Sequence, residues 1–224
     1  MIQTYNDMKI TLIEASQAPN IRVSLALNIT MAADPNFSIK NLPELTSKKA
    51  KFLTDAEHTS VLEHVNYCFL ITGISRSLLA QLTRQRHSSP TSGSQHYQDY
   101  SDYPAAADKG FPLMSSLLIK ECVETYQHMI QTGMPKEEAR QVLPNAMVTN
   151  YMLTINARSL MLFFRHRLCH RNVKEMRIFA NKLLRICYAH FPNLFQHAGP
   201  QCFMDGKCKQ GHMSCGRIWE GYEF

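Results

Sequence analysis

Apolar and polar positions alternate in two segments, while other apolar positions recur at helical spacing. Alternation predicts β-strands at residues 8–14 and 65–71, because successive side chains of a strand point to opposite faces. A third strand is predicted at 148–155. Spacings of three and four predict helices at 75–86, 117–131, 136–143, 156–168 and 173–190, with one more ending at 50–55. This order, without an internal repeat, predicts one α+β domain.

Individual residues mark where these elements begin and end. Ser75 and Asn156 are expected at helix N-caps, because their side chains accept hydrogen bonds from the first turn. Gly73 is expected to break a strand and Gly133 to end a helix. The segments 87–97 and 104–112 are predicted to be loops. Inward-facing residues are expected at Leu78, Leu79, Leu82, Ile119, Cys122, Val123, Tyr126, Ile130, Val173, Met176, Ala180, Leu183 and Cys187.

The composition fits a folded protein with reduced thiols. Hydrophobic residues make up 45% of the chain and charged residues 19%, which argues against disorder. No apolar run has the length of a membrane helix, and the first residues lack the pattern of a secretory signal. We therefore expect a cytoplasmic protein that contacts no membrane and whose seven cysteines are free thiols.

Acidic residues are missing from two long stretches, His64–Gln98 and Ala139–Lys174. A local field of one sign favours an anionic ligand. Two alternatives are an ordinary solvated basic face and a non-catalytic nucleic-acid binder. The stretches lack the interleaved aromatic residues of base-stacking surfaces, which argues against nucleic acid. Their basic residues are Arg76, Arg84, Arg86, Arg140, Arg158, Arg165, Arg167, Arg171 and Lys174.

The first candidate site is Arg84-Gln85-Arg86, followed after seven residues by Ser94. Two arginines at i and i+2 of a helix end point about 200° apart, so they are expected to serve different partners. The loop between supplies hydroxyl groups and free N–H groups around Gly93, which suit a phosphate. The alternative is a plain polar turn after a helix.

The second candidate site is a helix that carries Arg158, Arg165 and Arg167. Arg158 and Arg165 are seven residues apart and share a helix face, whereas Arg167 points roughly opposite to Arg158. Cations that point in two directions suit a site shared between subunits. The alternative is an ordinary set of surface arginines.

Both candidates lie in runs that resemble the flavin-dependent thymidylate synthases. The run SVLEHVNYCFLITGISRSLLAQLTRQRHSSPTSGSQHY is similar to the core of that family, whose signature is Arg-His-Arg, seven residues, then Ser. ARQVLPNAMVTNYMLTINARSLMLFFRHRLCHRNVKEMRIFANKLL is similar to its second block, and AGPQCFMDGKCKQGHMSCG to the tail of its longer members. The resemblance extends from about His58 to Cys215.

The resemblance implies a fold, an activity and cofactors. The fold is a central antiparallel or mixed sheet with flanking helices, in a homotetramer whose active sites are shared between subunits. The reaction converts dUMP to dTMP, with methylene-tetrahydrofolate as carbon donor, FAD as hydride carrier and NADPH as reductant. We expect a single catalytic α+β domain at 1–195 and a Cys/Gly-rich tail at 196–224.

The resemblance also implies roles for individual residues. Arg167 is the expected catalytic residue, stabilising the uracil as N3 ionises, because a guanidinium supports an anion without losing a proton. Ser94 has no base placed by sequence to activate it, so we interpret it as a nucleotide ligand. The expected flavin-binding residues are Ser60, Arg84, Gln85, Arg86, Ser92, Asn156, Arg158 and Leu162, with His58 nearby. The expected nucleotide-binding residues are Gln81, Leu82, Thr83, Arg84, Ser92, Gly93, Ser94, Gln95, His96, Arg140 and Arg167.

Four residues differ from the family pattern. Gln85 replaces the signature histidine, Ser92 a Glu or Gln, His96 an arginine expected at the nucleotide phosphate, and Leu162 a His or Asn beside the flavin. Replacing Arg by His removes a permanent bidentate charge. The loss corresponds to about 2 kcal/mol of affinity. These differences leave open an alternative substrate: UMP, dCMP or a modified pyrimidine nucleotide.

The tail contains Cys202, Cys208 and Cys215, with His197 and His212. Intervals of six and seven differ from the short cysteine pairs of structural zinc sites. A reduced, ordered tail that covers a neighbouring subunit is favoured over zinc, so no metal is predicted.

Overall fold

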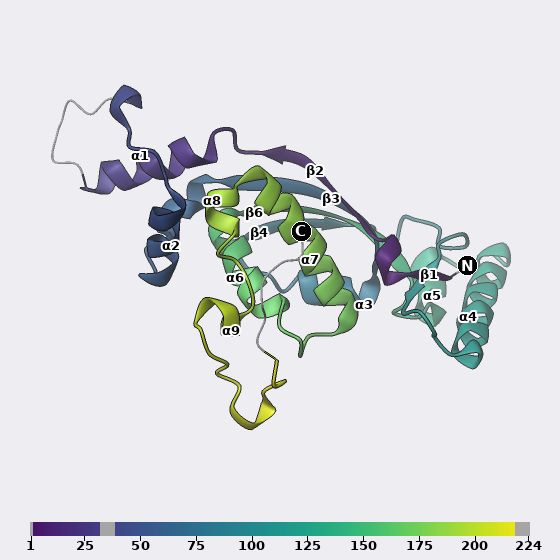
Figure 1. Ribbon diagram of the computed structural model, residues 1–224. Coiled ribbons are helices and arrows are strands. Elements are labelled where there is room, and N and C mark those ends of the chain that lie inside the picture. Colours follow the sequence, from purple (N-terminus) through teal and green to yellow (C-terminus); the bar gives the residue numbers. More distant parts are fainter. Residues whose placement is uncertain (1, 32–38, 218–224) are drawn as a thin grey trace. The chain divides into compact units, whose positions relative to one another are not determined.

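The computed structural model describes residues 2–31 and 39–217 of the chain (Figure 1). By internal contacts the chain divides into two compact units. Unit 1 consists of Met1–Thr11, Phe69–Gln85 and Pro90–Leu153, and unit 2 of Leu12–Cys68, Arg86–Ser89 and Thr154–Phe224. The predicted division at residue 195 stays a prediction.

Strands and helices both occur along the chain without regular alternation, as expected for an α+β protein. The strands are β1 Ile2–Thr4, β2 Lys9–Ala15, β3 Asn66–Ser75, β4 Ser88–Ser92, β5 Ala105–Ala107 and β6 Val148–Asn156. The α-helices are α1 Pro19–Met31, α2 Ser47–Asp55, α3 Arg76–Leu82, α4 Leu113–Gln131, α5 Lys136–Ala139, α6 Ala157–Arg167, α7 Lys174–His190, α8 Pro192–Phe195 and α9 Gln201–Met204. In this part of the chain, no helix is long and apolar enough to cross a membrane.

The main sheet has the strand order β2-β3-β6-β4. Strands β3 and β6 run antiparallel, because Arg76 N–H donates to Met147 O at one end and Ala157 N–H donates to Val65 O at the other. The short strands β1 and β5 form a separate parallel pair, with Ile2 opposite Ala105. The predicted central sheet with an antiparallel core is therefore confirmed.

Aromatic side chains fill the core of unit 2. Tyr67, Phe164, Phe179 and Phe195 are fully buried, and Phe195 meets the rings of Tyr67 and Phe164 edge-on at 5.9 Å. Edge-to-face contact is a favoured arrangement for buried rings. These residues come from β3, α6, α7 and α8, and Figure 1 shows α7 beside α8. This aromatic packing holds α6, the helix that carries the candidate arginines, in a defined position.

Unit 1 has a smaller core around Tyr100 and Tyr126, both fully buried. The backbone N–H of Tyr100 donates to the Tyr126 hydroxyl at 3.3 Å. Tyr126 lies on α4, whose inward residues Ile119, Val123 and Ile130 pack against the same cluster, as predicted.

Several predicted boundaries are wrong. Gly73 does not break β3 but continues it with φ +77°, and its C=O accepts a hydrogen bond from Gln3 Nε2 at 2.7 Å. The helix from Ser75 ends at Leu82 rather than residue 86. The predicted loops at 87–97 and 104–112 contain β4 and β5. Both strands were missed because β4 is polar and exposed, and β5 consists of three alanines without alternation.

Two helices also differ from expectation. Helix α4 begins at Leu113, four residues before the predicted start, and the exposed Val173 is an N-cap rather than a core residue. Helix α1 was not predicted, because its apolar residues show no single stripe.

Candidate active site

Two strand-to-helix junctions begin the helices that carry the candidate arginines. At the end of β3, Ser75 Oγ accepts from Leu78 N–H at 2.9 Å. At the end of β6, Asn156 Oδ1 accepts from Ser159 N–H at 2.9 Å. Both predicted N-caps are confirmed, so each helix starts directly where a sheet strand ends.

A cavity of about 480 Å³ in unit 2 brings together three predicted flavin-binding residues, Asn156, Arg158 and Leu162. Arg165 also lines it, which confirms that Arg158 and Arg165 share a helix face. Ser60 lies on the 3₁₀ turn Thr59–His64 and is exposed; Thr59 and Glu63 of that turn line the cavity, whereas Ser60 does not.

The lining of this cavity fits part of a flavin nucleotide. Met161 and Leu162 supply an apolar wall, while Arg158 supplies a permanent cation, and the volume lies in the range of small-molecule sites. Arg158 Nη1 pairs with Glu63 Oε1, and both side chains are 49% exposed. A phosphate in this cavity therefore has to compete with the Glu63 carboxylate for the guanidinium.

His87 also lines the cavity, from the two-residue link between Gln85 and β4. Its φ of +56° is a conformation that side chains other than glycine rarely adopt. The sequence offered no signal for this geometry. We take His87 as an additional residue of the candidate flavin cavity.

In unit 1 the turn after α3 presents Arg84 to solvent, and no hydrogen-bond or ion-pair partner for Arg84 lies in the described chain. Leu82 is 2% exposed, and its C=O accepts from Gln85 N–H at 2.9 Å, so its side chain is not available to a ligand. Thr83 Oγ1 donates to Leu79 O at 3.2 Å. Of these neighbours, Arg84 is thus the side chain best placed to bind an anion.

The turn at Gly93 leaves no space for a larger residue. A Cβ at Gly93 would lie 2.6 Å from Gln98 Oε1 and 2.9 Å from Thr149 Oγ1. Its N–H donates to Asn150 O at 3.0 Å, and its C=O accepts from Arg76 Nη1 at 3.3 Å. These two hydrogen bonds hold the backbone of Gly93 in place directly before Ser94. The Oγ of Ser94 accepts from His96 N–H at 3.2 Å.

His96 contacts an acidic residue. Its Nδ1 lies 2.6 Å from Glu137 Oε2, and both side chains are 48% exposed. Lys136 Nζ donates to Tyr97 O at 3.1 Å, which anchors the same loop to α5. Arg140 Nε donates to Glu137 O at 3.1 Å, and its terminal nitrogens have no partner in the described chain. The unpaired terminal nitrogens of Arg140, rather than the imidazole of His96, are therefore available to bind a phosphate.

Arg167 is the last residue of α6 and is half-buried. No hydrogen-bond or ion-pair partner for its guanidinium lies in the described residues. Burial, together with Arg165 and Arg167, lowers the pKa of His166 below its usual value, so His166 carries little positive charge at neutral pH. The unpaired cation at this helix end is thus Arg167.

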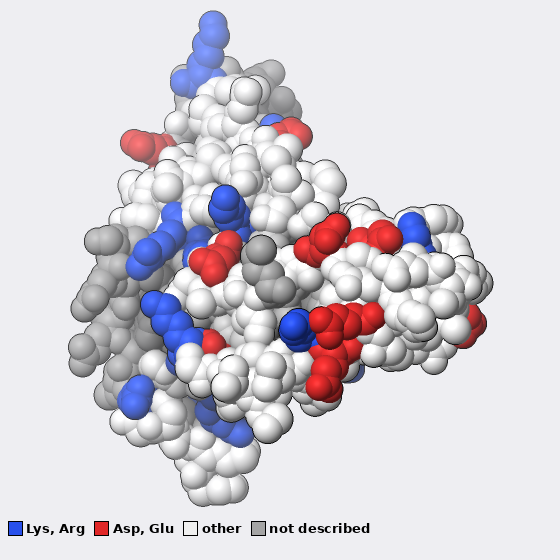
Figure 2. All heavy atoms as spheres, turned by 90° about the vertical axis from the view of Figure 1, so that its right-hand side faces the viewer, with Lys and Arg blue, Asp and Glu red and all other residues white. Residues whose placement is uncertain are grey.

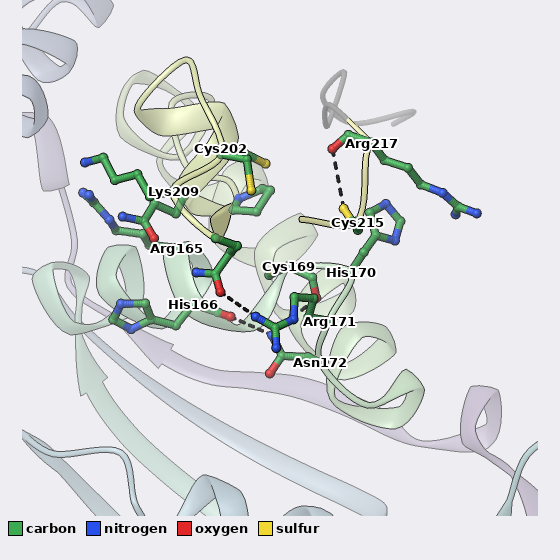
Figure 3. Close-up of a pocket in the computed structure, with 14 residues that line it drawn as sticks. Arg165, His166, Cys169, His170, Arg171, Asn172, Cys202, Lys209, Cys215 and Arg217 are labelled. Carbon is green, nitrogen blue, oxygen red and sulfur yellow. Dashed lines mark hydrogen bonds between the residues drawn. The ribbon is translucent and has the colours of Figure 1, made fainter. Parts of the chain in front are cut away.

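A second cavity in unit 2, of about 290 Å³, was not predicted (Figure 3). It lies between the end of α6, the turn before α7 and the tail. Its lining includes Cys169, Cys202, Cys208 and Cys215. No sequence pattern groups Cys169 with the tail, because a spacing of 33 residues to Cys202 carries no signal.

The predicted site residues are divided between the units. Ser60, Arg86, Asn156, Arg158, Leu162 and Arg167 belong to unit 2. Gln81, Leu82, Thr83, Arg84, Gln85, Ser92, Gly93, Ser94, Gln95, His96 and Arg140 belong to unit 1. Their individual roles stay predictions.

Comparison with known proteins identifies relatives. A family model described as "Thymidylate synthase complementing protein" matches residues 11–193. A flavin-dependent thymidylate synthase of Geobacter sulfurreducens is 34% identical over 225 residues, covering 95% of this chain and 96% of that protein. One from Clostridium tetani is 36% identical over 199 residues, covering 79% and 80%.

A solved structure has the same fold. It is described as a UMP/dUMP methylase, PolB, from Streptomyces cacaoi, bound with 5-Br dUMP. The TM-score is 0.73 at 19% identity, with 87% of this chain and 94% of that chain covered. The family match and these relatives show that the chain belongs to the flavin-dependent thymidylate synthase family.

Proposed function

We propose that this enzyme methylates C5 of the uracil ring in dUMP to give dTMP. In this proposal methylene-tetrahydrofolate donates the carbon, and FAD, reduced by NADPH, supplies the hydride. The observation that carries the proposal is the similarity to a flavin-dependent thymidylate synthase over 95% of the chain. The enzyme acts as a homotetramer with active sites shared between subunits, as the family resemblance implies.

The cavity lined by Asn156, Arg158 and Leu162 is where the chain's own residues would hold the flavin. Leu162 and Met161 exclude water from one side, which suits an aromatic ring system. Arg158 binds an anionic group of the cofactor after leaving Glu63.

Arg167 acts on the nucleotide. As N3 of the uracil releases its proton to solvent water, negative charge spreads over the ring and C5 becomes a better nucleophile toward the one-carbon unit. A guanidinium remains charged at every working pH, so it stabilises this charge without supplying the proton itself. The lack of a competing partner for Arg167 in the described chain supports this role.

A second candidate is methylation of a different pyrimidine nucleotide, such as UMP or dCMP. Two observations favour it: His96 is bound to Glu137, and the structural neighbour is described as a UMP/dUMP methylase. Turnover of dUMP, UMP and dCMP with methylene-tetrahydrofolate and NADPH separates the two candidates. We expect dUMP to be turned over best; a clear preference for UMP or dCMP would establish the second candidate.

A non-catalytic nucleic-acid binder is disfavoured. On the face drawn in Figure 2, acidic side chains lie among the basic ones, so the described residues form no uninterrupted basic stripe there. The purified protein is expected to show the yellow absorbance of bound flavin. A colourless protein that fails to bind added FAD would contradict the proposed function.

A further inference from the structure

A further cavity in unit 2, of about 600 Å³, adjoins the candidate flavin cavity. The two cavities share four lining residues, which are Thr54, Glu57, Arg165 and Met204. Arg165 belongs to α6, whereas Met204 is the last residue of α9 in the tail. The tail of the same chain therefore supplies part of the border between the two cavities.

Asp205, the residue after Met204, fastens the tail to α6. Its Oδ1 lies 2.9 Å from Arg165 Nη2, and its Oδ2 lies 2.6 Å from Lys209 Nζ. The same Oδ2 accepts from Gln201 Nε2 at 3.2 Å. The Asp205 side chain is only 15% exposed, so water and salt screen its pair with Arg165 less than a surface ion pair. Figure 3 shows the side chains of Arg165 and Lys209 extending in the same direction, as expected for cations that share a partner.

The border between the cavities keeps a positive charge. Hydrogen bonds to the carboxylate, chiefly the one from Lys209, lower the pKa of Asp205 below its usual range, so Asp205 is ionised at neutral pH. Two cations that share one carboxylate leave one positive charge in excess. Asp205 bonds only to Nη2 of Arg165; in the described chain the Nε and Nη1 groups have no partner and are available to a ligand.

Building on the proposed function, we propose that Asp205 is a positioning residue of the cofactor site, which holds Arg165 so that its free N–H groups bind a phosphate group of FAD. FAD carries two phosphate groups, and Arg165 adds a second cation to Arg158 in the lining of the flavin cavity. A guanidinium held on one edge by a carboxylate loses less conformational freedom when an anion binds its other edge. The same contact holds Met204 in place as a wall of the flavin cavity.

The test is the FAD affinity of the full chain, measured by titrating FAD-free protein and following flavin fluorescence. Asp205→Asn has nearly the same shape as the wild type but removes one negative charge from the border. The change of charge alone would strengthen binding of the anionic cofactor, whereas loss of positioning weakens it. We expect the affinity to fall about tenfold. Asp205→Glu, which keeps the carboxylate, should retain most of the affinity.

A double-mutant cycle establishes whether Asp205 acts through Arg165. Arg165→Met should also weaken FAD binding, and adding Asp205→Asn to it should lower the affinity no further, because the group to be positioned is gone. Glu124→Gln is the matched control. It removes the carboxylate of an exposed ion pair with Lys120, and Glu124 lines none of the three cavities, so FAD affinity should stay unchanged.

The outcomes distinguish the role of Asp205 from the proposed function. An Asp205→Asn variant that binds FAD as tightly as the wild type, or more tightly, overturns the positioning role and leaves the proposed function intact. An Arg165→Met variant with unchanged affinity also overturns it, and so do additive losses in the double variant, because Asp205 would then act independently of Arg165. A wild type that binds no FAD overturns both.

Discussion

Arg167 stands out among the arginines because no partner in the described chain holds its guanidinium. Arg167→Lys keeps the positive charge but loses the planar guanidinium group with its paired N–H donors. We expect kcat to fall about a hundredfold and the nucleotide affinity to fall much less, because the interaction strengthens as charge develops on the ring. Single-turnover kinetics and nucleotide titration measure the two effects.

Arg158→Lys is the matched comparison, on the same helix but in the cavity with Glu63. It should weaken FAD retention and leave nucleotide binding unchanged once FAD saturates the enzyme. If both variants instead lose melting temperature equally and neither loses activity selectively, the two arginines only hold the structure together, and the catalytic role of Arg167 is wrong.

Tyr151 on β6 is 1% exposed, and its hydroxyl has no hydrogen-bond partner in the described residues. Burial raises its pKa to about 12. A buried, unpaired hydroxyl costs free energy, so Tyr151→Phe should raise the free energy of unfolding by about 1 kcal/mol. Tyr67→Phe should lower it by about 1 kcal/mol, because the Tyr67 hydroxyl lies 3.1 Å from His190 Nδ1. Urea denaturation measures both; a destabilised Tyr151→Phe would contradict the prediction.

At the scale of elements, Asn156 has two proposed roles: it is the N-cap of α6, and it lines the cavity proposed for the flavin. Asn156 Oδ1 is used by Ser159 N–H, which leaves its amide nitrogen for the flavin cavity. Asn156→Asp keeps the cap and should leave melting unchanged while FAD affinity falls. Asn156→Ala should lose both, with about 1 kcal/mol less stability. Equal FAD affinity in wild type and Asn156→Asp would show that residue 156 is only a cap.

Elements whose signals are local could be predicted from the sequence, and elements defined by distant partners could not. Ser75 and Asn156 predict helix starts, because an N-cap side chain bonds to an N–H only three residues later and its signal is therefore local. Strand β4 (Ser88–Ser92) exists because it pairs with β6 in the sheet, and its Ser-rich sequence has no apolar face. The Arg158–Glu63 pair joins residues 95 positions apart. The face shared by Arg158 and Arg165 was predictable, whereas the carboxylate beside it was not.

At the scale of the whole molecule, a shared active site is a prediction that subunit mixing can test. Arg84 and Arg167 are both unpaired in the described chain and belong to different units. If one subunit supplies Arg84 and another Arg167 to each site, then Arg84→Ala and Arg167→Ala should each be nearly inactive alone. Exchange of subunits between the two variants should restore part of the activity, because some mixed sites receive both arginines.

The control for this experiment is a mixture of Arg84→Ala with the double variant Arg84→Ala, Arg167→Ala. No site in that mixture contains Arg84, so activity should stay at the level of the variants alone. Sedimentation and mass spectrometry of differently tagged chains establish that mixed oligomers form. Mixed oligomers without recovered activity would mean that each chain supplies both arginines to its own site; recovery confined to the first mixture would place the nucleotide between two subunits.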